Sequence, residues 1–458
     1  MTATLTAGPA VAGPEAGPDQ APPAGSSRIP ALDVLRGIAI LGTLATNIGI
    51  FVATSGEGAE GIGGHPFSQF VATAVGLLTD GKYIGLLTIM FGIGLEIQRQ
   101  SAVRRGDPWL GSYPWRAALL CLDGLLNYIF IFEYDVLMGY ALTGLVMCAV
   151  LTTTPRFQKW FLGMGLAAHV GYLSYFSGIF SGSNALNPDP EIAALLEKDP
   201  LTLTPAQLDQ VAQATGLSTD ELVGSAADMA SDWAPHTDSY WSMVHDRVLN
   251  FWGGRGEIPI MFTMGMGLFL VGAFLYRAGL FAPAGRRLRL WIMGLSFGIG
   301  LPLDWVTRLW FSEYTSMYNR YLTSAFVSIG ILALVAHFYA RPARDGSSRS
   351  TGLVGGALSR VGKMALSCYV AQNLIASILF YNWGLGLADK LAPFGLGIWS
   401  DLAAWVLVSA ILIAFATLWQ RHFRRGPLEW LWHVSHTWLM AHTTLKWRAN
   451  RAHRQVAH

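Results

Sequence analysis

The stretch PALDVLRGIAILGTLATNIGIFV, residues 30–52, is long enough to cross a bilayer as one helix, yet it contains ionisable side chains. Asp33 and Arg36 are three residues apart, and Arg36 and Asn47 are eleven apart, so all three lie near one helical face. A charged group costs roughly 2.5–3.5 kcal/mol at the centre of a membrane helix and usually faces a bundle interior or a wet cavity. The alternative for Asp33 and Arg36 is snorkelling towards the headgroups.

The overall composition places the chain in a membrane. Apolar residues make up 52% of the 458 residues, charged residues make up 13%, and the mean hydropathy is +0.39. A soluble chain would carry about 25% charged residues. The net charge of +2, without a basic run interleaved with aromatic residues, gives no sign of nucleic-acid binding. The sequence therefore predicts an all-α, polytopic membrane helix bundle.

Runs of about 20 apolar residues predict ten transmembrane helices. They are expected near 31–53, 67–97, 117–132, 136–153, 160–181, 258–276, 290–311, 321–340, 363–383 and 399–420. The second run is too long for one straight crossing and is interrupted by Asp80, Gly81 and Lys82. A broken or re-entrant second helix is therefore expected.

The distribution of charge predicts the domains and their orientation. Residues 1–27 are rich in Ala, Gly and Pro and read as a disordered tail, 28–432 as the transmembrane domain, and 433–458 as a basic tail. Lys and Arg concentrate in alternate loops, which by the positive-inside rule puts both termini in the cytoplasm. The acidic loop 182–257 then faces outward, either as a lid over a cavity or as a solvated spacer.

Other polar side chains inside the apolar segments predict a polar cavity between the helices. Asp304 and Arg308 are four residues apart and could form an internal ion pair. Each polar group could also be a satisfied interhelical hydrogen bond. The residues expected in or near the cavity, besides those of the first helix, are Asp80, Asn127, Asp135, Tyr140, Tyr369, Gln372 and Asn373.

One histidine stands out as a general-base candidate. His65 lies in GGHPF just before the second predicted helix, on the expected outer side. It could equally be an ordinary interfacial loop residue. The phosphate-binding loop, H-E-x-x-H, C-x-x-C and G-x-S-x-G motifs are all missing, so an ATP-driven pump, a zincin, a redox relay and an α/β-hydrolase lose support. The three cysteines fall in apolar segments, and no metal site is expected.

Several blocks of the sequence resemble the YeiB-like family of bacterial integral-membrane proteins. The blocks are LDVLRGIAILGTLATNIGIF at 32–51, GKYIGLLTIMFGIG at 81–94, YDVLMGYALTGL at 134–145, GLFLVGAFLYRAGLF at 267–281, VGKMALSCYVAQNLI at 361–375 and GPLEWLW at 426–432. That family resembles a broader superfamily of transmembrane acyltransferases, which includes heparan-α-glucosaminide N-acetyltransferase. The shared feature is the L-D-x-x-R-G opening, here Leu32, Asp33, Arg36 and Gly37. The chain departs from the bacterial O-acyltransferases of surface glycans at Asn47, where they carry His, whereas the glucosaminide acetyltransferase resembles it there with Asn. At Asn127 the chain departs from many YeiB-like sequences, which carry His.

The resemblance implies an acyltransferase in a bacterial cytoplasmic membrane. It would move an acyl group, acetyl first, from acyl-CoA to a hydroxyl or amine of a glycan or small-molecule acceptor. Arg36, Asp33 and Asn47 would hold the thioester, and His65 would act as base, oriented by Asp80 or Asp135. The cations expected to meet the CoA phosphates are Lys82, Arg104, Arg105, Arg286, Arg287, Arg344 and Arg349.

Two other functions fit the same residues. Intramembrane charges, a broken helix and a polar cavity also suit a small-molecule transporter or exporter, although no inverted repeat is visible. A scaffold without turnover is the third reading. Besides the lipid bilayer and the acceptor, the sequence leaves a homodimer open as a further partner.

Overall fold

The computed structural model describes residues 29–52, 65–106, 109–177, 195, 203–215, 218–219, 239–249, 251–252, 255–340 and 352–456, and these contain helices and no strand. The expected tail 1–27 lies outside the described residues. The first half of the chain forms α1 (Pro30–Val52), α2 (Pro66–Thr79), α3 (Lys82–Arg105), α4 (Trp109–Phe130), α5 (Leu137–Val150), α6 (Pro155–Phe176), α8 (Pro205–Thr215) and α10 (Tyr240–Leu249). The second half forms α11 (Glu257–Arg277), η4 (Pro283–Gly285), α12 (Arg286–Leu295), η5 (Ser296–Gly300), α13 (Leu301–Trp310), α14 (Ser312–Tyr318), η6 (Asn319–Thr323), α15 (Ser324–Tyr339), α16 (Gly352–Lys363), α17 (Ala365–Phe380), α18 (Leu387–Leu391), η7 (Ala392–Phe394), α19 (Ile398–His422) and α20 (Pro427–Val456).

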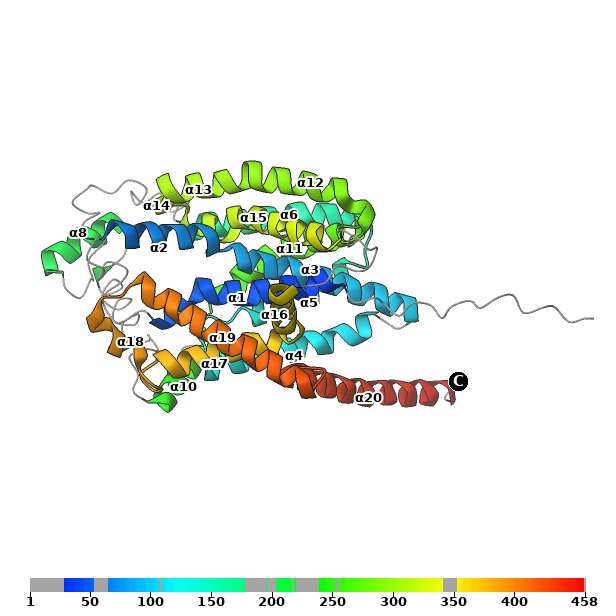
Figure 1. Cartoon of the computed structure of the whole chain (residues 1–458). Helices are drawn as coiled ribbons and strands as arrows, with labels where there is room; N and C mark the ends of the chain where they lie inside the picture. Colours follow the sequence, from blue (N-terminus) through cyan, green and yellow to red (C-terminus); the bar gives the residue numbers. More distant parts are fainter. Residues whose placement is uncertain are drawn as a thin grey trace, which may run out of the picture.

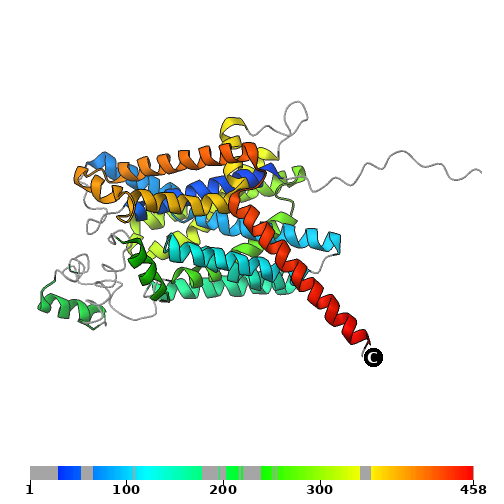
Figure 2. The same cartoon turned by 90° about the horizontal axis from the view of Figure 1, so that it is seen from below.

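The long helices lie side by side along roughly one axis (Figures 1 and 2). The buried α1 packs against α3, α16, α17 and α19, so it forms the centre of the bundle. α8 and α10 lie at one end, and α20 leaves the other end. The boundary expected between 432 and 433 falls inside α20, which continues without a break to Val456.

The predicted membrane bundle is confirmed, but the count of ten crossings is not. Among the described residues, six helical segments are long and apolar enough to span a membrane, or seven if α16 and α17 form one bent span. α5 has only 14 residues, which is short for a crossing of about 20. α4 and α6 have 22 residues each and are long enough to cross, but they are not apolar enough to count among these six segments.

The predicted interruption of the second helix is confirmed. α2 ends at Thr79 and α3 begins at Lys82, with Gly81 between them at φ 75°. That backbone conformation favours glycine, and a Cβ at this position would also overlap the Arg320 carbonyl oxygen. The break therefore places charged side chains in the middle of an otherwise apolar segment, and Lys82 there is buried.

The chain also bends between α16 and α17, and the distribution of apolar residues in the sequence does not predict this bend. The two helices meet at Met364 with an angle of 90°. α16 crosses α1 very closely, because Gly37 faces the Leu358 carbonyl and Gly362 faces the Asp33 carbonyl, where any Cβ would overlap. Small residues allow such close helix packing in membranes. The bend thus sits directly against the start of α1.

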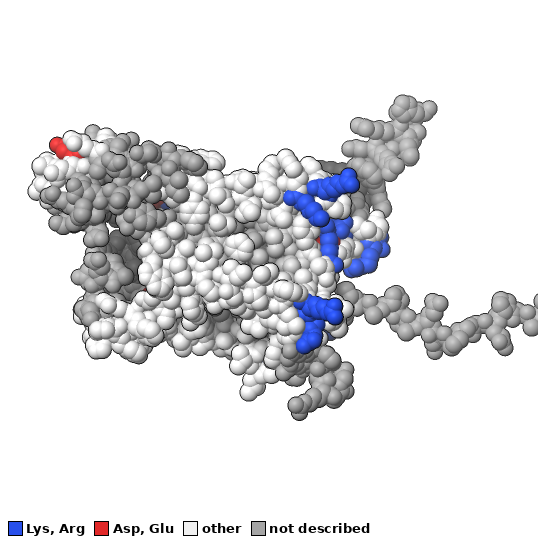
Figure 3. All heavy atoms as spheres, turned by 90° about the horizontal axis from the view of Figure 1, so that it is seen from above, with Lys and Arg blue, Asp and Glu red and all other residues white. Residues whose placement is uncertain are grey.

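Charge separates the two ends of the bundle. Lys and Arg side chains gather at one end in Figure 3, the end that holds the start of α1, the end of α3 and the start of α20. We call this the basic end. α8 at the opposite end belongs to the acidic loop. The Gln207 side chain reaches back to its start, where Oε1 accepts hydrogen bonds from the Thr204 amide and hydroxyl (3.0 and 2.9 Å).

Candidate functional site

A pocket of about 360 Å³ opens at the basic end of the bundle. Its walls come from α1, α3, α4, α5, the bend between α16 and α17, and the first two turns of α20. The lining residues are Arg36, Ile40, Leu87, Met90, Phe91, Gly94, Leu95, Gln98, Tyr113, Arg116, Leu120, Leu137, Gly362, Lys363, Ala365, Leu366, Tyr369, Glu429 and Trp432. Most of these residues are apolar, so the pocket combines an apolar wall with a few charged side chains.

Three cations line this pocket. Arg36 Nη1 lies 3.5 Å from Asp33 Oδ1, as the spacing on the first helix predicts. Arg116 donates to Gln98 Oε1 (2.6 Å) and lies over the Trp432 ring at 5.4 Å from its centroid. Lys363 is the last residue of α16, at the bend. Because guanidinium and ammonium groups are donors without acceptors, the rim suits an anionic group such as a phosphate.

Glu429 joins α20 to the start of α17. Its Oε1 accepts the backbone N–H groups of Leu366 (2.8 Å) and Ser367 (3.2 Å), and its Oε2 accepts the Ser367 hydroxyl. The carboxylate accepts two amide N–H groups at the start of α17 that have no partner within the helix. Its negative charge also interacts favourably with the positive end of the helix dipole. The GPLEWLW block therefore holds one wall of the pocket in place.

The inner end of the pocket meets a buried carboxylate. The Tyr369 hydroxyl, which lines the pocket, donates to Asp135 Oδ2 at 3.4 Å, and Asn127 Nδ2 donates to the same oxygen at 2.8 Å. Asp135 Oδ1 accepts the Leu137 amide at 2.9 Å and so caps α5. The structure thus brings together three residues that the sequence places in a polar cavity. Asn127 and Asp135 are eight residues apart, on α4 and the segment after it, and Tyr369 comes from α17, 234 residues after Asp135.

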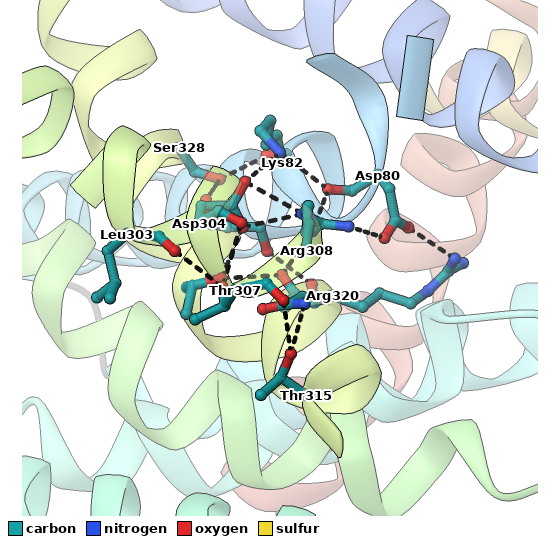
Figure 4. A network of polar contacts seen from close by, with 12 residues as sticks. Asp80, Lys82, Leu303, Asp304, Thr307, Arg308, Thr315, Arg320 and Ser328 are labelled. Atoms are coloured by element: carbon teal, nitrogen blue, oxygen red, sulfur yellow. Dashed lines mark hydrogen bonds and ion pairs between the residues drawn. The ribbon is translucent and has the colours of Figure 1, made fainter. Parts of the chain in front are cut away.

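A second polar cluster surrounds the break between α2 and α3 (Figure 4). Lys82 Nζ lies 2.7 Å from Asp304 Oδ2, and both side chains are almost fully buried. Arg308 bridges the two carboxylates, with Nε 3.1 Å from Asp304 Oδ1 and Nη1 2.5 Å from Asp80 Oδ2. Arg320 lies 2.8 Å from the other oxygen of Asp80. We call these five residues the charge network.

A π-helical segment shapes the charge network. η6 (Asn319–Thr323) carries Arg320, and its Thr323 hydroxyl donates to Asp304 Oδ1 at 2.6 Å. The Asn319 carbonyl accepts Arg308 Nη2 at 2.7 Å. A π-helical turn contains an extra residue, which changes the direction of its side chains and leaves some backbone carbonyls free. Here the Asn319 carbonyl is free to accept a hydrogen bond from Arg308. The predicted Asp304–Arg308 ion pair is present as part of this larger network.

The structure separates some of the other predicted site residues from the pocket. His65 is exposed and precedes α2 at the end opposite the basic end, where the nearby Ser68 accepts a hydrogen bond from Trp399 Nε1 (3.2 Å). Asn47 is half-buried and adjoins Thr46, which contacts the Thr79 carbonyl at the α2–α3 break. Neither side chain is part of the pocket wall.

The cations predicted to bind phosphates also lie elsewhere. Lys82 is buried in the charge network. Arg104, Arg105, Arg286 and Arg287 are exposed at the basic end but do not line the pocket, and Arg344 and Arg349 lie outside the described residues.

The remaining cavity residues are buried within the bundle. The Tyr140 hydroxyl pairs with Thr88 Oγ1 at 2.9 Å, beside the Phe91 ring. Gln372 and Asn373 follow Tyr369 on α17, and each is 1% exposed. Lys363, Glu429 and Trp432 are pocket residues that sequence reasoning missed, although Glu429 and Trp432 lie in the GPLEWLW block. Lys363 lies in the VGKMALSCYVAQNLI block at 361–375, so these two blocks are the sequence signal that could have found all three.

Comparisons with known proteins agree with the resemblance in the sequence blocks. Residues 275–439 match the family described as "Protein of unknown function (DUF418)". "Uncharacterized protein YxaH" of Bacillus subtilis (strain 168) is 26% identical over 426 residues, covering 89% of this chain and 94% of that protein. "Uncharacterized protein YeiB" of Escherichia coli (strain K12) is 28% identical over 430 residues, covering 88% and 94%. The comparisons support a relationship to the YeiB-like proteins. No solved structure matches the chain.

Proposed function

We propose that the chain is a membrane-embedded acyltransferase that uses acyl-CoA, acetyl-CoA first, as donor. The acceptor would be a hydroxyl or amine of a glycan or small molecule. The observation that carries the proposal is the pocket at the basic end, which combines an apolar wall, three cations at its rim and a buried Tyr369–Asp135 pair at its inner end. The positive-inside rule makes this end cytoplasmic, where acyl-CoA is made.

The rim and the wall of the pocket suit different parts of this donor. Arg36, Arg116 and Lys363 offer charge-assisted hydrogen bonds to phosphate groups. Leu87, Phe91 and other apolar residues suit the pantetheine arm and a short acyl chain, since ligand pockets are mostly apolar with a few placed polar groups. The thioester would then reach Tyr369.

The transfer step follows from the buried pair. The Tyr369 hydroxyl would relay the proton of the acceptor hydroxyl or amine to the Asp135 carboxylate. The acceptor oxygen or nitrogen would bond to the thioester carbonyl carbon, the carbon–sulfur bond would break, and the CoA thiolate would recover the proton. A carboxylate base reached from the pocket replaces His65, which lies exposed at the opposite end.

Calorimetry tests the proposal by measuring the binding of acetyl-CoA to the full chain in nanodiscs. Arg36→Ala, Arg116→Ala and Lys363→Met should each weaken binding roughly tenfold or more, because a hydrogen bond to a charged group contributes about 1.5–3 kcal/mol. The matched control is Arg104→Ala with Arg105→Ala, which removes two exposed charges from the same end but none from the pocket. Unmeasurable binding, or an equal loss in the control, contradicts the proposal.

Asp135→Asn separates binding from chemistry. This variant should keep the affinity for acetyl-CoA, because Asp135 lies behind Tyr369 and does not line the pocket. Transfer to a supplied acceptor should fall by about 10²–10⁴-fold if Asp135 is the base. Full transfer activity in Asp135→Asn would remove this residue from the mechanism.

A transporter remains the second candidate, and one observation favours it. The 90° bend between α16 and α17 lies at the pocket, and broken helices that end at the substrate site are typical of secondary transporters. The pocket would then hold an amphipathic anion that is carried rather than cleaved. If acetyl-CoA does not bind, this reading becomes the leading one.

A further inference from the structure

Several buried polar atoms beside the pocket have no hydrogen-bond partner within the described part of the chain. Both amide atoms of Gln372, the Nδ2 of Asn373, the Oδ1 of Asn127 and the Nε of Arg255 are in this state. Each of these four side chains belongs to a residue that is at most 4% exposed. Unpaired buried polar atoms cost free energy, and in native proteins such groups commonly bind ordered water.

We call the stretch from Tyr369 on α17 to Tyr381, together with Asn127 and Arg255 beside Asp135, the row. Tyr369 lines the pocket, and Tyr381, twelve residues further along the chain, donates to Glu133 Oε1 at 3.2 Å. Twelve residues of helix span about 18 Å. Gln372 and Asn373 fall between these two tyrosines on the buried side of α17. The row therefore connects a pocket residue to Glu133, whose side chain is 19% exposed.

The facing wall of the row is the segment between α4 and α5. Glu133 and Asp135 both lie on it, and Arg255 ties it down, with Nη1 3.0 Å from the Glu133 carbonyl and Nη2 3.0 Å from the Asp135 carbonyl. Asn127 donates to Asp135 and leaves its own oxygen unpaired. The unpaired atoms of the row thus come from α4, from the segment before α11, and from α17.

The chemistry of the row selects water as its ligand. Unpaired donors and unpaired acceptors both occur, and water is a small molecule that satisfies both. A bound ion is disfavoured because Glu133 already pairs with Arg247, and among the described residues no group of His, Cys, Asp or Glu could hold a metal. We infer that this row is a water-filled track that links the end opposite the basic end with Asp135 and the pocket.

A water track gives Asp135 and Tyr369 a route for proton exchange with the aqueous phase at Glu133. Each transfer moves one proton along a hydrogen bond between water and a carboxylate or hydroxyl, so no other reactant is needed. The track does not depend on what the pocket binds, and it would serve a transporter as well as an acyltransferase. Its test therefore stands apart from the acetyl-CoA experiment.

Hydroxyl-radical labelling of the full chain in nanodiscs, read out by mass spectrometry, tests the track, because radicals produced from bound water oxidise nearby side chains. Met138 is the reporter, since its Sδ lies 3.6 Å from Arg255 Nη2. Met147 is the control on the same helix, because it is 0% exposed and belongs to the apolar core. Met138 should be oxidised clearly faster than Met147. Equal, slow oxidation of the two methionines would overturn the inference.

A pair of variants then asks whether water reaches Met138 through the track or directly from outside. Gln372→Met with Asn373→Leu fills the row with apolar groups of similar size, and Met138 oxidation should fall towards the level of Met147. The matched control is Leu374→Met with Ile378→Leu, which changes the exposed face of the same helix and should leave Met138 oxidation unchanged. Undiminished Met138 oxidation in the filled variant would overturn the track. If that variant does not fold, the single replacement Gln372→Met is measured in its place, with Leu374→Met as its control, and the same outcomes decide.

Discussion

The charge network and the water-filled track are both buried in the bundle, and they treat their polar groups in opposite ways. In the charge network every ionised side chain has a partner of opposite charge within about 3 Å, and Thr323 and a backbone carbonyl fill the remaining positions. In the track, some amide and guanidinium atoms have no hydrogen-bond partner in the part of the chain that the structure describes. The charge network has the features of a structural contact that holds helices together. The track has the features of a site that binds and releases water.

The difference matters because intramembrane charge alone does not identify a functional site. From the sequence, Lys82 and Asp80 are as strong site candidates as Asp135. Their satisfied contacts indicate that they hold the α2–α3 break against α13 and η6. An ion pair buried in low dielectric is costly to disrupt but adds little when complete. Unsatisfied polar atoms next to a pocket are the more informative signal.

The largest effect is expected from Asp304→Ala. This change leaves Lys82, which is 2% exposed, without its buried partner. Removing one partner of a buried ion pair destabilises a protein by about 3–5 kcal/mol. Thermal or denaturant unfolding in detergent measures the loss. The double variant Lys82→Met with Asp304→Leu should recover most of it, and a double variant as unstable as Asp304→Ala would show that the pair does more than balance charge.

A smaller effect is expected at the edge of the charge network. Arg320 is 32% exposed, and its partner Asp80 is 26% exposed, so water screens the pair. Arg320→Ala should therefore lower the free energy of unfolding by about 1 kcal/mol or less, and added salt should reduce the difference further. Unfolding curves at low and high salt check this. A loss as large as that of Asp304→Ala would mean that the outer and inner parts of the network are equally buried.

Replacing a polar side chain of the track by an apolar one should not lower the free energy of unfolding as the changes in the charge network do. Asn373→Leu removes an amide donor that has no hydrogen-bond partner among the described residues, and replacing such a group can be neutral or stabilising. The free energy of unfolding should therefore change by about 1 kcal/mol or less. Chemical unfolding in the same detergent measures it. A loss of several kcal/mol would place Asn373 in the structural class and remove the contrast between the two regions.

The smallest effect is expected from His65→Ala. His65 is exposed at the end opposite the pocket, and surface substitutions usually change stability by within about 0.5 kcal/mol. Acetyl-CoA affinity and transfer should also stay unchanged, because the residue lies away from the pocket. The rate of acyl transfer is measured for His65→Ala and for Asp135→Asn at equal concentrations of folded protein, and the two rates are compared. A selective loss in His65→Ala would return the base to the original sequence hypothesis.

The amino-acid sequence by itself determined the features that depend on neighbours along the chain. The apolar runs specify a membrane helix bundle, the spacing of Asp33 and Arg36 specifies one polar helix face, and Asp80-Gly81-Lys82 specifies a break. These features follow from helical geometry and local backbone chemistry, which act over a few residues.

Only the tertiary structure decided which polar groups meet. Asp135 and Tyr369 are 234 residues apart, Lys82 and Asp304 are 222 apart, and Glu429 caps a helix that begins more than 60 residues before it. Helical periodicity gives the face of each side chain but neither the neighbouring helix nor its depth, so the sequence assigned Lys82 to a phosphate and left Lys363 unnoticed. The bend at Met364 and the close crossing of α1 by α16 fix those neighbours, because they set where each buried face finds its partner.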